Sequence, residues 1–141
     1  MSPLGISLLC VFIQVALTLL AIVRMGMARI ESVKSKQVTM AQVALDTSAY
    51  SIRIQQLQNN VRNQFETPVL FFALIGIAAA VGQVNWGVAL ASIGYVATRI
   101  VHHVIHVGSN RVRQRFNVFV LGLAFLTAGW ISLGLALIGI V

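Results

Sequence analysis

Residues 67–98 read TPVLFFALIGIAAAVGQVNWGVALASIGYVAT, and these 32 positions contain no Asp, Glu, Lys or Arg. A helix needs about 20 apolar residues to cross the roughly 30 Å hydrocarbon core of a bilayer. The stretch is therefore too long for one span. Its centre, residues 82–87 (GQVNWG), combines turn-forming residues with a tryptophan of the kind found at membrane interfaces. The stretch predicts two transmembrane helices joined by a tight turn.

Two further segments without acidic or basic residues, 1–23 and 116–141, lie toward the ends of the chain. Only 9% of all residues are charged and 58% are hydrophobic. Soluble domains carry about 25% charged residues, so this composition excludes a soluble domain. We therefore expect an all-α membrane protein, a bundle of four transmembrane helices. The spans are predicted at about residues 4–30, 51–81, 86–107 and 111–140 of a single domain, residues 1–141.

The basic residues predict the orientation of these spans. All ten flank the first or the third connection: Arg24, Arg29, Lys34, Lys36, Arg53, Arg62, Arg99, Arg111, Arg113 and Arg115. Loops rich in Lys and Arg stay in the cytoplasm, so we expect both termini on the non-cytoplasmic side of a multi-pass membrane protein. The net charge of +7 could also suggest nucleic acid, but no soluble fold is available to bind it. We expect no nucleic-acid partner.

The second expected span starts with the polar stretch 55–66, QQLQNNVRNQFE. At 100° per residue, five polar side chains of a continuous helix fall on one face: Gln55, Asn59, Arg62, Asn63 and Glu66. Ionisable groups at membrane depth are expensive and usually mark a functional site. Pro68 follows and is expected to loosen one backbone hydrogen bond.

The third span carries a second polar face, which consists of Tyr95, Arg99, His102 and His106. The sequence Gly108-Ser109-Asn110 then predicts a helix stop followed by an N-cap. The fourth helix is expected to open with three arginines at positions 111, 113 and 115. A helix N-terminus and several guanidinium groups together attract anions. One carboxylate, several amides and an excess of guanidiniums suit a peptide-like ligand that is zwitterionic and carries a net negative charge.

Simpler interpretations exist for several of these residues. Arg99 could pair with Glu66 and only hold helices together, and Arg113 could be a lipid-headgroup anchor. The cluster His102–His106 has neither a cysteine nor a second carboxylate beside it, so we expect no metal site.

Residues 62–72, RNQFETPVLFF, resemble the signature of the MAPEG family, the membrane-associated proteins in eicosanoid and glutathione metabolism. The pattern Arg99-x-x-His102-x-x-x-His106-x-Gly108 followed by Arg111-x-x-x-Arg115 is similar to the third and fourth helices of that family. The resemblance covers about residues 53–119, and the four-span topology extends it to the whole chain.

The resemblance implies a homotrimer of four-helix bundles that binds glutathione between neighbouring subunits near the cytoplasmic face. Transferred position by position, it assigns Arg62, Asn63 and Glu66 to glutathione binding, His102 to the third-helix histidine and Arg115 to the arginine near the thiol. A first-helix arginine also contributes in the family; its depth favours Arg29 over Arg24. The remaining predicted glutathione-binding residues are Asn59, Arg99, His106, Arg111 and Phe119.

The function that the resemblance implies is a glutathione-dependent transferase or peroxidase, in which Arg115 is catalytic and activates the thiolate against lipophilic electrophiles from the bilayer. Three positions depart from the prostaglandin synthases of the family, because His106 and Phe119 replace tyrosines and Phe116 replaces a serine. We therefore do not expect prostaglandin isomerisation. The brevity of the chain favours a bacterial inner-membrane protein surrounded by lipids.

Two other functions fit the sequence. A non-catalytic lipid- or glutathione-binding protein would keep the fold without the thiolate chemistry. A small multidrug transporter would also use a carboxylate in the membrane, although such transporters carry it in the first span, which here has no charge before Arg24.

Overall fold

The computed structural model describes residues 1–44 and 46–140, which form helices and turns and contain no β-strand. The helices are α1 (Pro3–Lys34), α2 (Met40–Val43), η1 (Thr47–Ala49), α3 (Ile52–Asn63), α4 (Thr67–Ala80), α5 (Trp86–Val107) and α6 (Val112–Leu137). Four segments of the described chain are long and apolar enough to cross a membrane: Pro3–Lys34, Ile52–Ala80, Trp86–Val107 and Val112–Leu137. The expected all-α bundle with four spans is confirmed.

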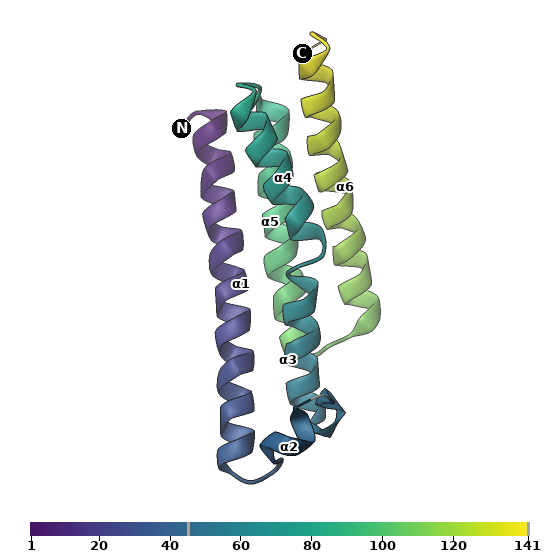
Figure 1. Cartoon of the computed structure of the whole chain (residues 1–141). Coiled ribbons are helices and arrows are strands. Elements are labelled where there is room, and N and C mark those ends of the chain that lie inside the picture. The colour runs from purple at the N-terminus through teal and green to yellow at the C-terminus, as the bar shows by residue number, and fades with distance from the viewer. Residues whose placement is uncertain (45, 141) are drawn as a thin grey trace.

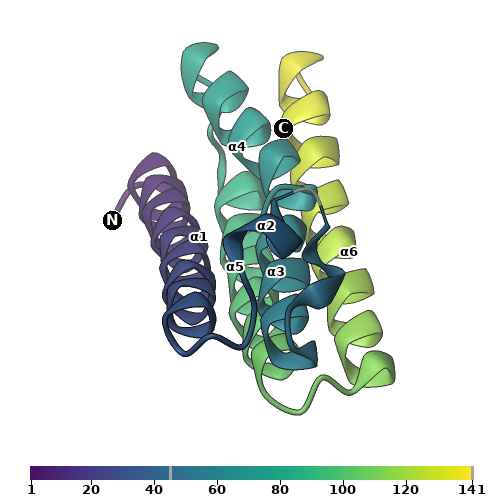
Figure 2. The same cartoon turned by 60° about the horizontal axis from the view of Figure 1, so that its bottom comes forward.

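The four spans run side by side, and both termini lie at one end of the bundle (Figure 1). The connection that contains α2 and the connection between α5 and α6 lie at the opposite end. The two basic connections therefore share one end of the molecule. Helix α5 is the central helix, since it packs against α1, α3 and α6 (Figure 2).

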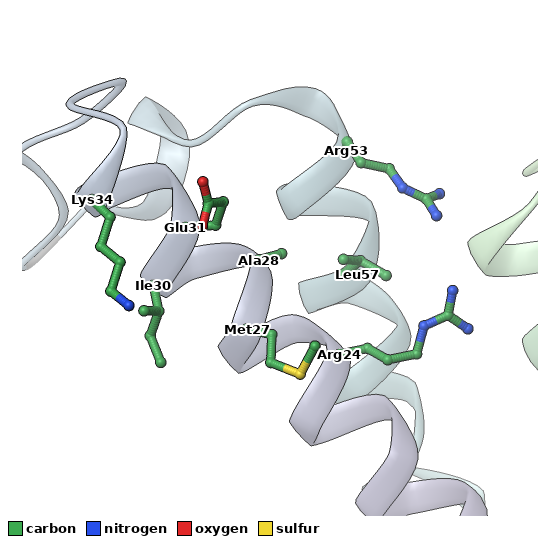
Figure 3. A pocket seen from close by; sticks show the side chains of 8 residues that line it. All are labelled: Arg24, Met27, Ala28, Ile30, Glu31, Lys34, Arg53 and Leu57. Carbon is green, nitrogen blue, oxygen red and sulfur yellow. The ribbon is translucent and has the colours of Figure 1, made fainter.

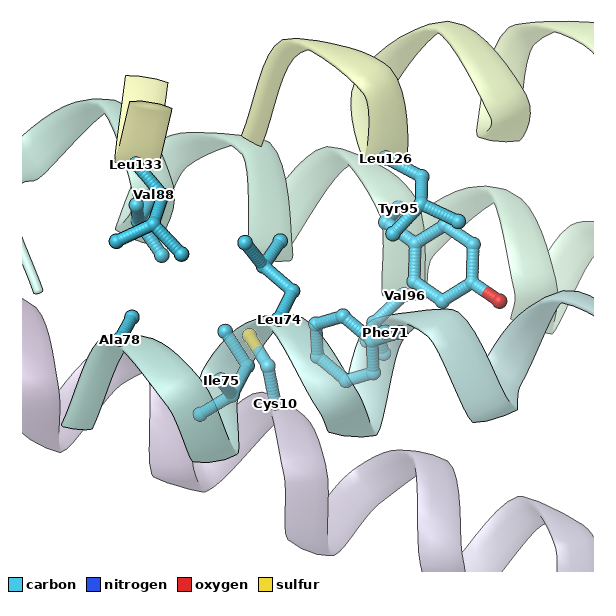
Figure 4. Packing of buried hydrophobic residues seen from close by; sticks show 10 residues of the cluster. All are labelled: Cys10, Phe71, Leu74, Ile75, Ala78, Val88, Tyr95, Val96, Leu126 and Leu133. Carbon is cyan, nitrogen blue, oxygen red and sulfur yellow. The ribbon is translucent and has the colours of Figure 1, made fainter. Parts of the chain in front are cut away.

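The core of the bundle is an apolar cluster between α1, α4, α5 and α6 (Figure 4). Its buried members are Cys10, Phe71, Leu74, Ile75, Ala78, Val88, Tyr95, Val96, Leu126 and Leu133. Large apolar side chains also cover the outside, where Phe12 is 71% and Leu19 is 56% exposed. In water such a surface would be unfavourable, whereas lipid tails solvate it.

The second span is not the continuous helix expected over residues 51–81. Helix α3 ends at Asn63 and α4 begins at Thr67, and Glu66 between them has φ −90° and ψ −98°, outside the helical region. Pro68 explains the interruption. It has no N–H to donate to the carbonyl of Gln64, and its ring would clash with that carbonyl in a straight helix.

The other boundaries lie close to those expected, with one correction at the start of α6. The N-cap position is Arg111 rather than Asn110, and no side chain of residues 1–44 or 46–140 caps this helix. Asn110 has a φ of 49°, and its N–H donates to the carbonyl of Ile105 at 2.8 Å, so its backbone terminates α5. Asparagine tolerates this left-handed conformation better than most residues. The loop before α3 contains the short helix α2, which a capping box between Thr39 and Gln42 starts.

Close packing between α5 and α6 predicts the effect of one glycine substitution. A Cβ at Gly122 would lie 2.6 Å from Oγ1 of Thr98, a buried hydroxyl that donates to the carbonyl of Tyr95. Gly122→Ala is expected to destabilise the bundle by about 1–3 kcal/mol through overpacking. A Cβ at Gly134 on the same helix would meet no atom of the other described helices within 4 Å, so Gly134→Ala is the control. A melting temperature in detergent that falls equally for both variants would contradict this packing.

Candidate functional site

A cavity of about 210 Å³ lies where the interruption between α3 and α4 faces α5 and the first turns of α6. Its lining residues are Asn63, Glu66, His102, Val112, Arg115, Phe116 and Phe119. Five of these belong to the predicted glutathione site, and they come from three separate spans. The fold therefore brings these five residues together around one cavity.

The acidic side of the cavity is formed at the interruption of the second span. The Asn63 side chain donates from Nδ2 to Oε2 of Glu66 at 2.7 Å. The amide oxygen Oδ1 of Asn63 is buried and has no hydrogen-bond partner among the described residues. Glu66 itself is exposed. The exposed carboxylate of Glu66 is therefore the acceptor suited to a ligand that carries N–H groups or an ammonium.

The basic side of the cavity is formed by Arg115 in the first turns of α6. Its Nη1 donates to Oδ1 of Asn110 at 2.6 Å, and the side chain is half-buried. Asn110 thus holds the guanidinium with its side chain while its backbone ends α5. The sequence analysis assigned Asn110 only to an N-cap and missed this contact. Within the described part of the chain no side chain caps the first N–H groups of α6, and these groups add positive potential at the same place.

His102 and two phenylalanines complete the wall. The ring of His102 lies edge-on to that of His106, with centroids 5.6 Å apart, and 6.3 Å from the ring of Phe119. Nδ1 of His102 is buried without a partner among the described residues. Phe116 is 62% exposed and extends the apolar wall outward. In residues 1–44 and 46–140, no three His, Cys, Asp or Glu side chains are grouped as a metal site would require.

Several predicted site residues do not line this cavity. Arg99 and His106 are buried, and Asn59, Arg62 and Arg111 are exposed elsewhere on the bundle surface. The hydrogen bonds of Arg99 go to the carbonyl of Asn63 and to Gln64. The simpler interpretation of Arg99 as a partner of Glu66 therefore does not describe its contacts.

The two candidate arginines of the first helix have different surroundings. Arg29 donates from Nη2 to Oε1 of Gln58 at 2.8 Å, and its guanidinium carbon lies 5.4 Å from the centroid of the Tyr50 ring. Arg24 instead lines a groove of about 570 Å³ between α1 and α3, together with Arg53 (Figure 3). In that view the two guanidinium groups extend to the same side of the groove. Arg53 also donates to the carbonyl of Val107.

The sequence of the chain matches a known protein family. The model of the MAPEG family matches residues 7–135, nearly the whole chain. The protein belongs to the MAPEG family. No curated protein and no solved structure matches the chain.

As a MAPEG protein, the chain is an integral membrane protein of the family that serves glutathione and eicosanoid metabolism, whose members generally use glutathione. The chemical groups of glutathione can be compared with those of the residues that line the cavity. Glutathione carries one ammonium, two carboxylates and amide groups, and the residues that line the cavity supply a carboxylate on Glu66 and a guanidinium on Arg115. The donor set of this MAPEG chain therefore fits glutathione.

Two buried hydrogen-bonded contacts of amide side chains in this MAPEG protein were not predicted from the sequence. Gln14 on α1 donates from Nε2 to Oε1 of Gln64 at 2.9 Å, and the two side chains are 0% and 1% exposed. Asn60 and His103 form a second buried contact, at 3.0 Å between Nδ2 and Nδ1. A signal existed for the first pair, because an amide in the middle of an apolar span must find an internal partner.

Proposed function

We propose that the protein is a membrane-bound glutathione-dependent transferase or peroxidase that acts on lipophilic electrophiles supplied from the bilayer. The observation that carries the proposal is the cavity lined by Glu66 and Arg115, in which opposite charges and apolar side chains border one space. Glutathione has opposite charges within one molecule, and an apolar second substrate would lie against Phe116 and Phe119.

The size of the cavity supports a site shared between subunits. Small-molecule sites usually enclose about 300–1,000 Å³, whereas the cavity measures about 210 Å³. We infer that one subunit contacts only part of the tripeptide and that a neighbouring subunit of a homotrimer covers the rest. Arg24 is the better first-helix candidate for that contribution, since Arg29 is already bonded to Gln58.

The chemistry depends on a negative charge at sulfur. Glutathione would supply a thiolate nucleophile, and a free thiol with a pKa of about 8.5 is only slightly ionised at neutral pH. Each unit by which the bound thiol's pKa falls corresponds to about 1.4 kcal/mol of preferential stabilisation of the anion. Arg115, held by Asn110, and the free N–H groups at the start of α6 would provide this stabilisation. Asn63 and Glu66 would bind the peptide part.

Thermal denaturation in detergent with and without glutathione tests the proposal, followed by turnover with a chloronitrobenzene-type electrophile and with a lipid hydroperoxide. We expect a raised melting temperature at millimolar glutathione and turnover with at least one of the two substrates. No shift at that concentration would contradict glutathione binding. A shift without turnover of any electrophile would leave a non-catalytic glutathione-binding protein.

The topology gives a separate prediction. Both basic connections lie at the end of the bundle opposite the termini. We therefore propose that the protein lies in a bacterial inner membrane with this end on the cytoplasmic side. A reporter that is active only in the cytoplasm, fused after the last residue, should give no signal. The same reporter inserted between α1 and α3 should be active. The reverse pattern would refute this orientation.

A further inference from the structure

We propose that Arg99 is a positioning residue, which holds the interruption between α3 and α4 in the shape that turns Asn63 and Glu66 toward the cavity. The inference rests on the proposed function, because it assigns a role within the same site. It also revises the sequence-based expectation that Arg99 contacts glutathione, since Arg99 does not line the cavity.

The first step concerns the backbone that the interruption leaves unpaired. In a continuous helix the carbonyl of Asn63 would accept from the N–H of Thr67. Here the N–H of Gln64 donates to the carbonyls of Asn60 and Val61, and the chain turns out of the helix after Asn63. The carbonyl of Asn63 instead accepts from Nη2 of Arg99 at 2.9 Å. A guanidinium from α5 thus replaces the missing backbone donor.

The second step concerns the Gln64 side chain, which joins the interruption to two neighbouring helices. Its Oε1 accepts from Nη2 of Arg99 at 3.4 Å and from Nε2 of Gln14 at 2.9 Å. Arg99 is only 2% exposed. A charged group buried within a membrane-spanning bundle is expensive and persists where it has a specific task. Binding a carbonyl for which the described part of the chain supplies no other donor is such a task.

The third step connects this contact with the ligand-binding side chains. Asn63 bears both the carbonyl that Arg99 holds and the amide that donates to Glu66 at 2.7 Å. If the carbonyl loses its donor, the peptide unit after Asn63 can rotate and change the direction of both side chains. Arg99 therefore acts on the cavity through Asn63 rather than through a contact of its own.

The test compares Arg99→Met and Arg99→Lys with Gln14→Met, which removes the other hydrogen bond to Gln64 and leaves the Asn63 carbonyl held. Amide hydrogen exchange is measured on the protein in detergent without glutathione. We expect Arg99→Met to speed exchange across residues 63–67 at least tenfold, Arg99→Lys to lie between it and the wild type, and Gln14→Met to have a smaller effect. Unchanged exchange in both Arg99 variants would overturn the proposal. If Arg99→Met does not fold, Arg99→Lys alone decides.

Binding and turnover provide the second readout. Arg99→Lys should raise the KM for glutathione about tenfold and change kcat less than threefold, because Arg115 remains in place. The loss of affinity should be equal for glutathione and for an analogue that lacks the glycine carboxylate. A loss confined to glutathione would mean that Arg99 binds the carboxylate directly and would overturn the proposal. If the wild type does not bind glutathione at all, the proposed function fails, while the exchange experiment still decides whether Arg99 holds the interruption.

Discussion

Replacing Arg115 by alanine is expected to reduce turnover with a chloronitrobenzene-type electrophile about ten- to hundredfold, which corresponds to one to two lost units of thiol pKa. The guanidinium borders the cavity and is oriented by Asn110, so its removal takes away the charge that would stabilise the thiolate. Asn63 and Glu66 stay in place and should still bind the peptide part. The thermal shift caused by glutathione should therefore persist in reduced form.

Two further variants give this prediction its controls. Arg115→Lys should fall between the wild type and Arg115→Ala, because lysine keeps the charge and loses the planar pair of donors. Arg113→Ala removes an exposed arginine of the same helix that does not line the cavity, and it should leave turnover unchanged. If Arg115→Ala abolishes binding altogether, Arg115 binds a carboxylate of the ligand, and thiol activation must come from His102 or the start of α6.

Glu66→Gln is expected to weaken glutathione binding by about 1.5–3 kcal/mol, the typical contribution of a hydrogen bond to a charged group. This corresponds to roughly a ten- to hundredfold rise in Kd. The substitution keeps the shape of the side chain and an acceptor for the Asn63 amide, but it removes the only carboxylate that lines the cavity among the described residues. Titration calorimetry in detergent measures the change.

Asp46→Asn is the matched control for Glu66→Gln. Asp46 is exposed in the connection between α1 and α3, where its carboxylate accepts from Ser48, and these hydrogen bonds lower the pKa of Asp46. Its neutralisation changes the net charge by the same amount and should leave the Kd unchanged. An unchanged Kd in Glu66→Gln with an intact fold would make Glu66 a structural partner of Asn63.

The sequence was sufficient to predict the four transmembrane segments, because charge and hydropathy indicate which segments enter a bilayer. The connection between α4 and α5 comprises residues 81–85 and overlaps the turn expected at residues 82–87; Gly82 adopts a φ of 69° there. The interruption at residues 64–66 was not predicted. Proline is tolerated in membrane helices when neighbouring groups satisfy the freed carbonyls. Here Arg99, which lies far away in the sequence, donates to the carbonyl of Asn63, and the equally distant Gln14 donates to the side chain of Gln64.

The cavity was predictable in part for a related reason. A helical face indicates which side chains share a direction, but it does not indicate which neighbouring helix covers them. Asn59 and Arg62 fall on the calculated face with Asn63, yet both are exposed, whereas the neighbouring Asn60 is buried against His103 of α5. Similarly, the depth of Arg29 along α1 carried no information about its contact with Gln58.

The ultraviolet absorbance of the bound thiolate, titrated against pH in the wild-type protein, tests thiolate activation most directly. A lowered pKa means that the anion forms at lower pH, so the absorbance should appear with a midpoint about one to two units below the free thiol's 8.5. In Arg115→Ala the midpoint should move back toward the value of the free thiol. If glutathione binds to the wild type but its thiol titrates at the free value, the cavity does not activate the thiolate, and the account of Arg115 is contradicted.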